Sequence, residues 1–296
     1  MRVPRPVLAA LAVLLGSTVL PALAVGTTAA AAPPTPTVVD IRASHHQNFD
    51  RVVFELDGPL PASRQVRYVD RLVADGSGLP VRVAGRAVLQ VRLEPAQAHD
   101  AGGQTSTRRR AFALPNVMAV VRAGDFEGVT TYGIGLARRT AYDVSTLRHP
   151  SRVVVDVRAA FPTVQRNVWF LDSDRFVDNV EPYFVPRSRP VPASFPATGL
   201  MDRIFAGVLP GERAQGLRLL RSRATGWDDL EVAGGIARVR LTGGCSSGGS
   251  TISIADAIIP TLRQLPTVDW VKVYGPGGHT GSPNGPSDSI PACLNP

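Results

Sequence analysis

The sequence predicts two domains behind a secretory signal: an N-terminal all-β sandwich over residues 37–159 and a C-terminal α+β domain over residues 165–276, with two helices packed on a small sheet. Up to residue 159, short segments alternate apolar and polar residues, which is typical of half-buried strands. From residue 167, strand patterns alternate with two amphipathic helical patterns. The chain of 296 residues is long enough for two domains that each bury a core.

The first 32 residues are typical of a secretory signal peptide. Arg2 and Arg5 precede an apolar run from Val7 to Leu15, and small residues follow this run. Cleavage after Ala24 and cleavage within residues 29–32 both fit the small residues that a signal peptidase reads. Retention as an uncleaved anchor is the alternative, although the run is shorter than the roughly 20 residues that span a bilayer. No later apolar run approaches that length, so we expect no transmembrane segment after signal removal and an extracytoplasmic protein, secreted or associated with the cell wall.

The strand pattern of the first domain is clearest in residues 51–57. Val52, Phe54 and Leu56 share one face of this segment, and charged residues fill the other. Further strands are predicted at residues 38–41, 66–73, 79–83, 87–93, 117–122, 129–137 and 152–157. The polar, glycine-rich segment 95–110 is predicted to be a mobile loop. Several short strands at this spacing indicate a β-sandwich or barrel.

The second domain combines strands with helices. The first helix is predicted over residues 198–209, with Pro210-Gly211 as its stop, and the second over residues 252–265. Pro260 lies inside the second helix, so we expect a kink near Asp256 or a break. The strands are predicted at residues 168–171, 181–191, 230–232, 236–241 and 268–274, the third and fourth forming a hairpin about Gly234-Gly235.

Positive charge is in excess but spread along the chain. The net charge is +8, and it falls to +6 when Arg2 and Arg5 leave with the signal. Lys272 is the only lysine, and the arginines alternate with acidic and apolar residues, so we expect no nucleic-acid partner. The sole cluster is Arg108, Arg109 and Arg110. The ordinary interpretation of this cluster is a solvated loop, and the alternative is a contact for anionic wall polymers or lipid head groups.

Two cysteines are present, Cys245 and Cys293. An even number of cysteines in an exported chain predicts one disulfide. This bond would tie down a C-terminal tail over residues 277–296. A redox role is disfavoured because the chain has no Cys-x-x-Cys pair.

The strongest catalytic candidate is Gly244 to Gly248, which matches Gly-x-Ser-x-Gly with Ser246 as the nucleophile. Three later residues follow in the order of a hydrolase triad: Asp256, Asp269 and His279. A nucleophile elbow requires an immediate turn from strand to helix. The predicted strand ends near Leu241 and the predicted helix starts near Ile252, so we expect no catalytic residue and no enzyme activity.

Cofactor and metal sites are not predicted. The glycine-rich residues 243–249 precede a helix, as in some phosphate sites, but no Gly-Lys-Ser or Gly-Lys-Thr follows. His45 and His46 are adjacent and point to opposite faces of a strand, and the other histidines lack ligand spacing. Three tryptophans are predicted to be core residues, with stacking on sugar rings as the alternative: Trp169, Trp227 and Trp270.

Residues 167–276 resemble the GerMN domain of exported bacterial proteins. The segments that carry the resemblance are residues 168–171, 209–217, 230–241 and 261–271. The sequence departs from the family pattern at Pro260 and at the cysteine pair with its tail. The resemblance implies a compact α+β fold, no catalytic residues and a role in assembly or ligand binding.

Residues 37–159 resemble the AMIN-like domain of actinobacterial exported proteins. Residues 49–56 and 149–157 carry this resemblance, which implies a β-sandwich with affinity for peptidoglycan or a neighbouring envelope protein. It assigns no binding residue. The sequence therefore supports the hypothesis of an exported, non-catalytic cell-envelope binding or scaffold protein that engages cell-wall glycan or an envelope protein assembly. The alternative is a small serine hydrolase that uses Ser246.

Overall fold

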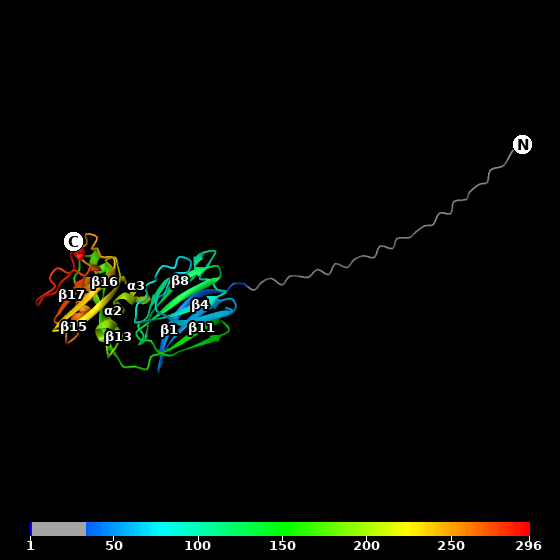
Figure 1. Cartoon of the computed structure of the whole chain (residues 1–296), viewed down its shortest axis with the longest axis horizontal. Helices are drawn as coiled ribbons and strands as arrows, with labels where there is room; N and C mark the ends of the chain where they lie inside the picture. The colour runs from blue at the N-terminus through cyan, green and yellow to red at the C-terminus, as the bar shows by residue number, and fades with distance from the viewer. Residues whose placement is uncertain (2–33) are drawn as a thin grey trace. The chain divides into compact units, whose positions relative to one another are not determined.

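The computed structural model describes Met1 and residues 34–296, and Pro34–Pro296 form one compact unit. The predicted signal peptide, residues 1–32, lies outside the described residues except for Met1. Figure 1 shows strands through the first part of this unit and helices in the second. Among the described residues, no helix has the length and apolar character needed to cross a membrane.

Residues 37–158 form two antiparallel sheets, which we call the sandwich. The first sheet has the order β1 (Thr37–His46), β2 (Phe49–Asp57), β11 (Ser151–Arg158) and β10 (Tyr142–Leu147). The second has the order β3 (Ser63–Val69), β4 (Ala87–Glu94), β9 (Val129–Leu136), β8 (Val117–Phe126) and β7 (Arg109–Ala111). A small separate pair consists of β5 (His99–Asp100) and β6 (Gly103–Gln104).

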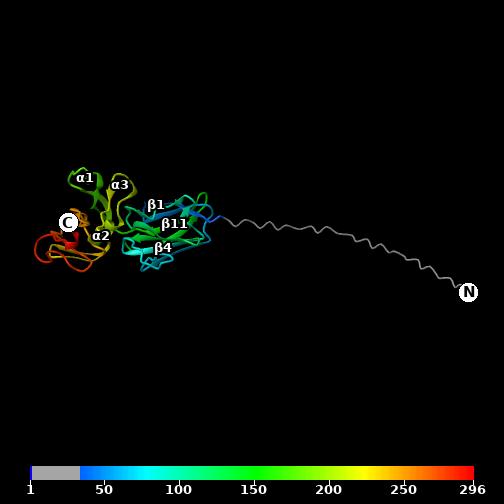
Figure 2. The same cartoon turned by 90° about the horizontal axis from the view of Figure 1, so that it is seen from above.

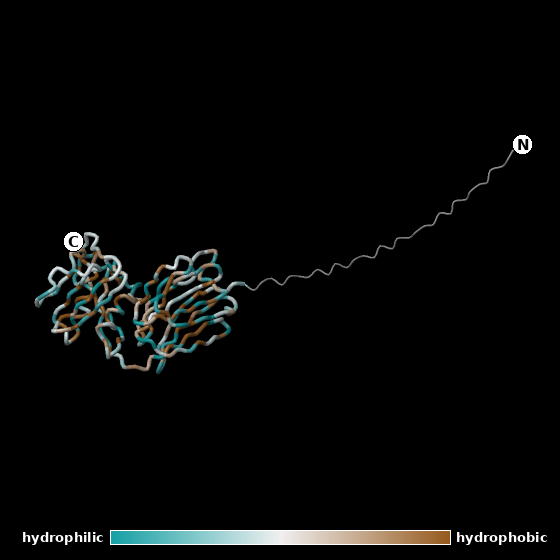
Figure 3. The backbone as a smooth tube through the Cα atoms, viewed as in Figure 1, coloured by the Kyte–Doolittle hydropathy of each residue, from teal (hydrophilic) through white to brown (hydrophobic). Residues whose placement is uncertain are grey.

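One apolar core joins the two sheets of the sandwich. Val52, Phe54 and Leu56 alternate inward along β2 and are at most 2% exposed, as the strand pattern predicts. They belong to the same buried cluster as Leu89 and Ile134 of the opposing sheet. Figure 2 shows β1 and β11 on one side and β4 on the other, and the tube in Figure 3 changes between brown and teal along these strands. The predicted β-rich N-terminal part is confirmed.

Two local predictions for the sandwich are wrong, and one strand was missed. Residues 79–83 form no strand, because only a single bridge between Val73 and Pro80 occurs there. Strand β10 was not predicted, since five of its six residues are exposed and it lacks apolar alternation. The segment 95–110 is not a loop throughout, because it contains β5 and β6 and the start of β7.

The C-terminal part, residues 163–296, contains the four α-helices of the described residues. Its first elements are β12 (Thr163–Asp172), α1 (Ser173–Val177), β13 (Phe184–Pro192), α2 (Pro196–Ala206), α3 (Pro210–Ala214) and β14 (Leu217–Arg218). The later ones are β15 (Ala224–Ala233), β16 (Ile236–Gly243), α4 (Ala255–Arg263), β17 (Trp270–Tyr274) and the 3-10 turn Ala292–Leu294. The strands form two sheets, in the orders β13-β12-β14 and β15-β16-β17. The sequence predicted a single small sheet, so this prediction is wrong.

The predicted hairpin is present, and two helix predictions need correction. Gly234 and Gly235 join β15 to β16 with φ angles of 57° and 77°, which favour glycine. Pro210 does not end a helix but begins α3, where its fixed φ and missing N–H suit a first turn. Helix α4 runs through Pro260 to Arg263 without the expected break, and it connects β16 to the parallel strand β17.

The C-terminal tail is held by a disulfide and by a buried lysine. Cys245 and Cys293 form the predicted disulfide, with Cα atoms 5.7 Å apart. Lys272 is fully buried, and its ammonium group donates to the carbonyl oxygens of Ser282 at 2.7 Å and Asn284 at 3.3 Å. The amide of Ser247 also donates to the carbonyl of Cys293. The tail is therefore part of the folded structure.

We expect the double variant Cys245→Ser/Cys293→Ser to be about 2–3 kcal/mol less stable, since the disulfide restricts the unfolded chain between the two cysteines. Urea unfolding of both proteins under non-reducing conditions measures the difference. Reduced and oxidised wild type provide the matched comparison. An unchanged unfolding midpoint would show that the hydrogen bonds of the tail suffice without the disulfide.

Candidate functional site at the junction of the sandwich and the C-terminal part

Helix α2 lies between the sandwich and the C-terminal part and is buried on both sides. Leu200, Met201 and Ile204 enter the core of the C-terminal part. Ala206 instead joins a cluster with Met118 and two alanines of the sandwich. The helix contains only two charged residues, so it has almost no side for solvent. This burial fixes the positions of its polar side chains.

Arg203 of α2 links the two parts of the protein. Its side chain is 1% exposed and donates to the carbonyl oxygens of Phe112 at 2.8 Å and Leu114 in the loop between β7 and β8. Its Nε also donates to the carbonyl of Pro190 at 3.0 Å. Burial lowers the pKa of Arg203 to about 9. The guanidinium is therefore satisfied by backbone acceptors of both parts and not by a carboxylate.

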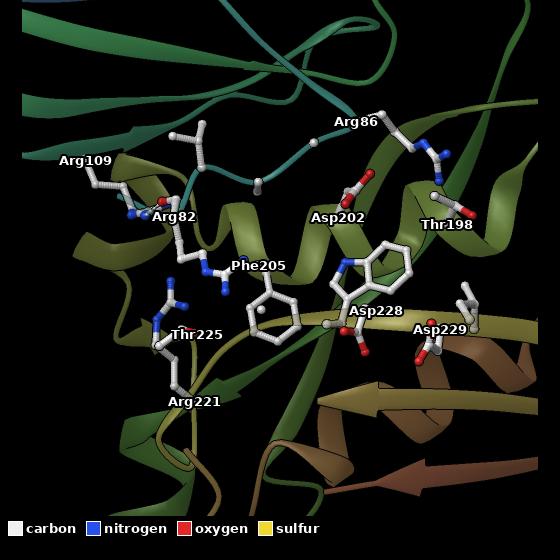
Figure 4. A pocket seen from close by; sticks show the side chains of 16 residues that line it. Arg82, Arg86, Arg109, Thr198, Asp202, Phe205, Arg221, Thr225, Asp228 and Asp229 are labelled. Carbon is white, nitrogen blue, oxygen red and sulfur yellow. Dashed lines mark hydrogen bonds between the residues drawn. The ribbon is translucent and has the colours of Figure 1, made fainter. Parts of the chain in front are cut away.

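A cavity of about 460 Å³, which we call the junction cavity, opens beside α2. Residues 82–86 and Arg109 of the sandwich line one wall, and residues of α2 and β15 line the other. Figure 4 shows Arg82, Arg109 and Arg221 gathered at one end, with Asp202 farther along the cavity toward Arg86. The cavity is of the size that holds small ligands or one part of a larger one.

Two glycines allow the loop of residues 82–86 to form this wall. A Cβ atom on Gly135 would lie 2.0 Å from the carbonyl oxygen of Ala84, and one on Gly85 would lie 2.5 Å from the carbonyl oxygen of Leu136. The close approach is fixed by a hydrogen bond of 2.8 Å from the amide of Arg86 to that same Leu136 oxygen. The loop therefore lies directly on β9, and the side chains beside it face α2.

Asp202 of α2 is the buried acid of the junction cavity. Its side chain is 5% exposed, and the Oδ2 atom accepts no hydrogen bond within the described residues. Burial raises the pKa of Asp202 to about 7, and the positive charge of Arg86 opposes this rise. A carboxyl group in this state can donate or accept a hydrogen bond near neutral pH. Asp202 therefore lines the cavity as a buried carboxyl whose charge can change near neutral pH.

The other wall of the junction cavity combines an aromatic ring with exposed acids. Trp227 is half-buried on β15 and packs partly against the core. Asp228 and Asp229 follow it, and both form ion pairs with Arg240, the first at 2.8 Å. The sequence predicted Trp227 to be a core residue. In the structure it is only half-buried and presents part of its ring to the cavity.

A second cavity of about 820 Å³ continues from the first, and we call it the arginine cleft. Six arginines line it: Arg108, Arg109, Arg110, Arg213, Arg218 and Arg221. No acidic residue is among the residues that line it. Arg109 and Arg221 also line the junction cavity, so the two cavities share a wall. Of the sequence-predicted anion contact, Arg109 and Arg110 therefore lie on strand β7, and Arg108 is exposed just before it; all three line the cleft.

The charges of the arginine cleft are mostly unbalanced. Among residues 34–296, Arg110 pairs with Asp40 at 2.7 Å, and the other five arginines have no carboxylate within ion-pair distance. Burial and then the positive charges of Arg221 and Arg108 lower the pKa of Arg109 to about 10. Burial also lowers the pKa of Arg221. An anion in the cleft would reduce this repulsion.

The predicted hydrolase residues are not joined into a triad. Ser246 accepts a hydrogen bond of 3.1 Å from the amide of Gly248, and no hydrogen bond within residues 34–296 joins it to His279. Asp256 instead accepts from the amide of Ser253 at 2.7 Å. Strand β16 ends at Gly243 and α4 begins at Ala255, so the segment between them is not a sharp elbow.

Asp202, Arg203 and the loop of residues 82–86 were not among the sequence-predicted site residues. Asp202 and Arg203 have the appearance of an ordinary polar side of an amphipathic helix. The scarcity of other charges in α2 was the one signal that this side is covered. In the part of the chain that the structure describes, no group of three His, Cys, Asp or Glu side chains could hold a metal ion.

Fold and site together define a two-sheet β-sandwich joined to an α+β part, with a polar cavity at their junction that can hold a ligand. Comparison with known families agrees with the first of these parts: residues 36–159 match the AMIN-like domain. The match covers the whole sandwich, and the GerMN resemblance of residues 167–276 stays a prediction. No curated protein matches the chain.

Proposed function

We propose that this is an exported, non-catalytic cell-envelope binding or scaffold protein that engages peptidoglycan or an envelope protein assembly. The AMIN-like match over residues 36–159 is the observation that carries this proposal, because such domains are generally associated with peptidoglycan and envelope binding. The predicted signal peptide, residues 1–32, supports export. The disulfide Cys245–Cys293 also suits an oxidising compartment.

The chemistry of the junction cavity favours a glycan as the ligand. Sugar rings present apolar faces that stack on aromatic side chains, and Trp227 offers such a ring. Sugar hydroxyls and amides donate to carboxylates and accept from guanidinium groups, and Asp202 and Arg86 lie beside Trp227 in this cavity.

Retention of the purified full chain on insoluble peptidoglycan tests this proposal. We expect retention above that of an unrelated protein of equal net charge, and about tenfold weaker retention of Trp227→Ala, since a stacked aromatic is a typical hot spot. Trp270→Ala is the matched control, because Trp270 is also half-buried in the same sheet but lies outside the cavity.

Thermal melts of both tryptophan variants establish that they are folded. Retention no greater than that of the unrelated basic protein would contradict peptidoglycan binding. Equal losses for the two variants would remove the junction cavity from the binding site.

A further inference from the structure

We propose that the arginine cleft binds a linear polymer that carries phosphate groups. The proposal rests on the extracytoplasmic location proposed above, and it does not depend on peptidoglycan binding in the junction cavity. The two cavities share Arg109 and Arg221 but differ in chemistry, since the junction cavity contains three aspartates and the arginine cleft has none.

The cleft is built from both parts of the protein. Arg108 and Arg109 come from β7 and the residue before it, whereas Arg213, Arg218 and Arg221 come from the segment that follows α2. Folding therefore brings together like charges that are about 100 residues apart in the sequence, and no carboxylate within residues 34–296 balances these five. Such repulsion lowers stability, which is a common property of sites that bind a charged ligand.

The guanidinium groups favour phosphate over single carboxylates. Each guanidinium offers a planar fork of N–H donors and no acceptor, and it matches phosphate oxygens in pairs. Arg108 and Arg213 are exposed, and neither side chain donates to another group of the described residues within hydrogen-bond distance. Because several guanidinium groups converge on the cleft and none of its side chains is acidic, a group with three or four oxygens uses the donors better than a carboxylate with two.

The cleft continues into its neighbours, which favours a chain over a single ion. Arg108 also lines a further open hollow of about 720 Å³ together with Arg122. The one acid of that hollow, Asp125, is already engaged by His99 at 2.8 Å and by the amide of Ala98. At the other side, Arg109 and Arg221 continue the positive surface into the junction cavity. A polymer with regularly spaced phosphates can therefore contact arginines in more than one hollow.

Fluorescence anisotropy of labelled long-chain polyphosphate with the purified full chain tests the proposal. We expect binding that Arg108→Gln/Arg213→Gln weakens about 10- to 100-fold, since each lost charge-assisted contact contributes roughly a factor of ten. The matched control is Arg148→Gln/Arg187→Gln, which removes the same charge from one exposed turn of the sandwich and from β13. The salt dependence of binding should also become shallower by about one to two in the cleft variant only.

Equal weakening by the cleft and control variants, or no binding of polyphosphate, would overturn the proposal. Binding of three other phosphate-bearing probes identifies the source of the phosphate. These probes are inorganic phosphate alone, vesicles of phosphatidylglycerol with phosphatidylcholine, and single-stranded DNA. We expect each of these to bind more weakly than polyphosphate. Tighter binding of the vesicles, or of DNA at equal charge, would assign the cleft to a membrane or to nucleic acid and overturn the polymer. Polyglutamate that binds as tightly as polyphosphate would overturn the preference for phosphate.

The same variants separate this proposal from the proposed function. Arg108 and Arg213 lie outside the junction cavity, so the cleft variant should lose polyphosphate and keep its retention on peptidoglycan. If wild type binds polyphosphate but is not retained on peptidoglycan, only the proposed function is wrong. If wild type is retained on peptidoglycan but does not bind polyphosphate, only the polymer proposal for the arginine cleft is wrong.

Discussion

Arg203→Ala is expected to lower the free energy of unfolding by about 5 kcal/mol, because it leaves buried carbonyl oxygens without donors and opens a cavity beneath α2. The native guanidinium donates to the carbonyls of Pro190, Phe112 and Leu114, and no other donor of the described residues reaches the latter two. Each unsatisfied buried acceptor costs about 1–3 kcal/mol. Urea unfolding followed by tryptophan fluorescence measures the loss.

Two further variants make this experiment specific. Arg203→Lys keeps the positive charge but cannot reach three carbonyls at once, so we expect an intermediate loss of stability. Arg187→Ala, at a half-buried site on β13 where the side chain donates only to the neighbouring Pro186 carbonyl, should change stability by less than about 1 kcal/mol. A loss for Arg203→Ala as small as that for Arg187→Ala would show that Arg203 does not hold the two parts together.

Asp202→Asn is expected to remove a pH dependence from the stability of the protein. In the folded protein, burial raises the pKa of Asp202 from 3.8 to about 7. Below about pH 4 the carboxyl is protonated in the folded and unfolded states alike, so it contributes no penalty. As the pH rises toward 7, the unfolded state ionises first, and wild-type stability falls. Since one pKa unit corresponds to about 1.4 kcal/mol, the penalty above pH 7 reaches up to about 4 kcal/mol.

The amide of Asp202→Asn stays neutral, so the variant should match wild type near pH 4 and be more stable at pH 8. Urea unfolding at a series of pH values measures both curves. Asp143→Asn, at an exposed position of β10, is the matched control and should leave the wild-type pH dependence unchanged. Parallel curves for wild type and Asp202→Asn would contradict the buried, high-pKa state of this carboxyl.

Local alternation predicted the sandwich well, and it failed where a strand lacks a buried side. Val52, Phe54 and Leu56 alternate with polar residues in the sequence, and in the structure all three are buried in the core of the sandwich. Strand β10 lies at the edge of its sheet, with Val144 and Leu147 more than 40% exposed, so no apolar period marks it. Strand β7 consists of two arginines and an alanine, and its pairing with β8 is decided by tertiary structure.

The candidate site was only partly predictable because it is formed by segments distant in sequence. The cluster Arg108 to Arg110 was visible as a cluster, but its partners Arg213, Arg218 and Arg221 are isolated in the sequence. In the sequence Asp202 has the pattern of an ordinary helical acid, and only the fold shows that the loop of residues 82–86 lies against it. The disulfide was predictable because Cys245 has one possible partner.

Hydrogen–deuterium exchange of the full chain with solubilised peptidoglycan fragments tests most directly whether the junction cavity holds an envelope ligand. We expect slower exchange of backbone amides in residues 82–86 and 225–230, which form opposite walls of the cavity, and unchanged exchange in the exposed edge strand β10. Unchanged exchange throughout, or protection confined to surfaces away from this cavity, would contradict it.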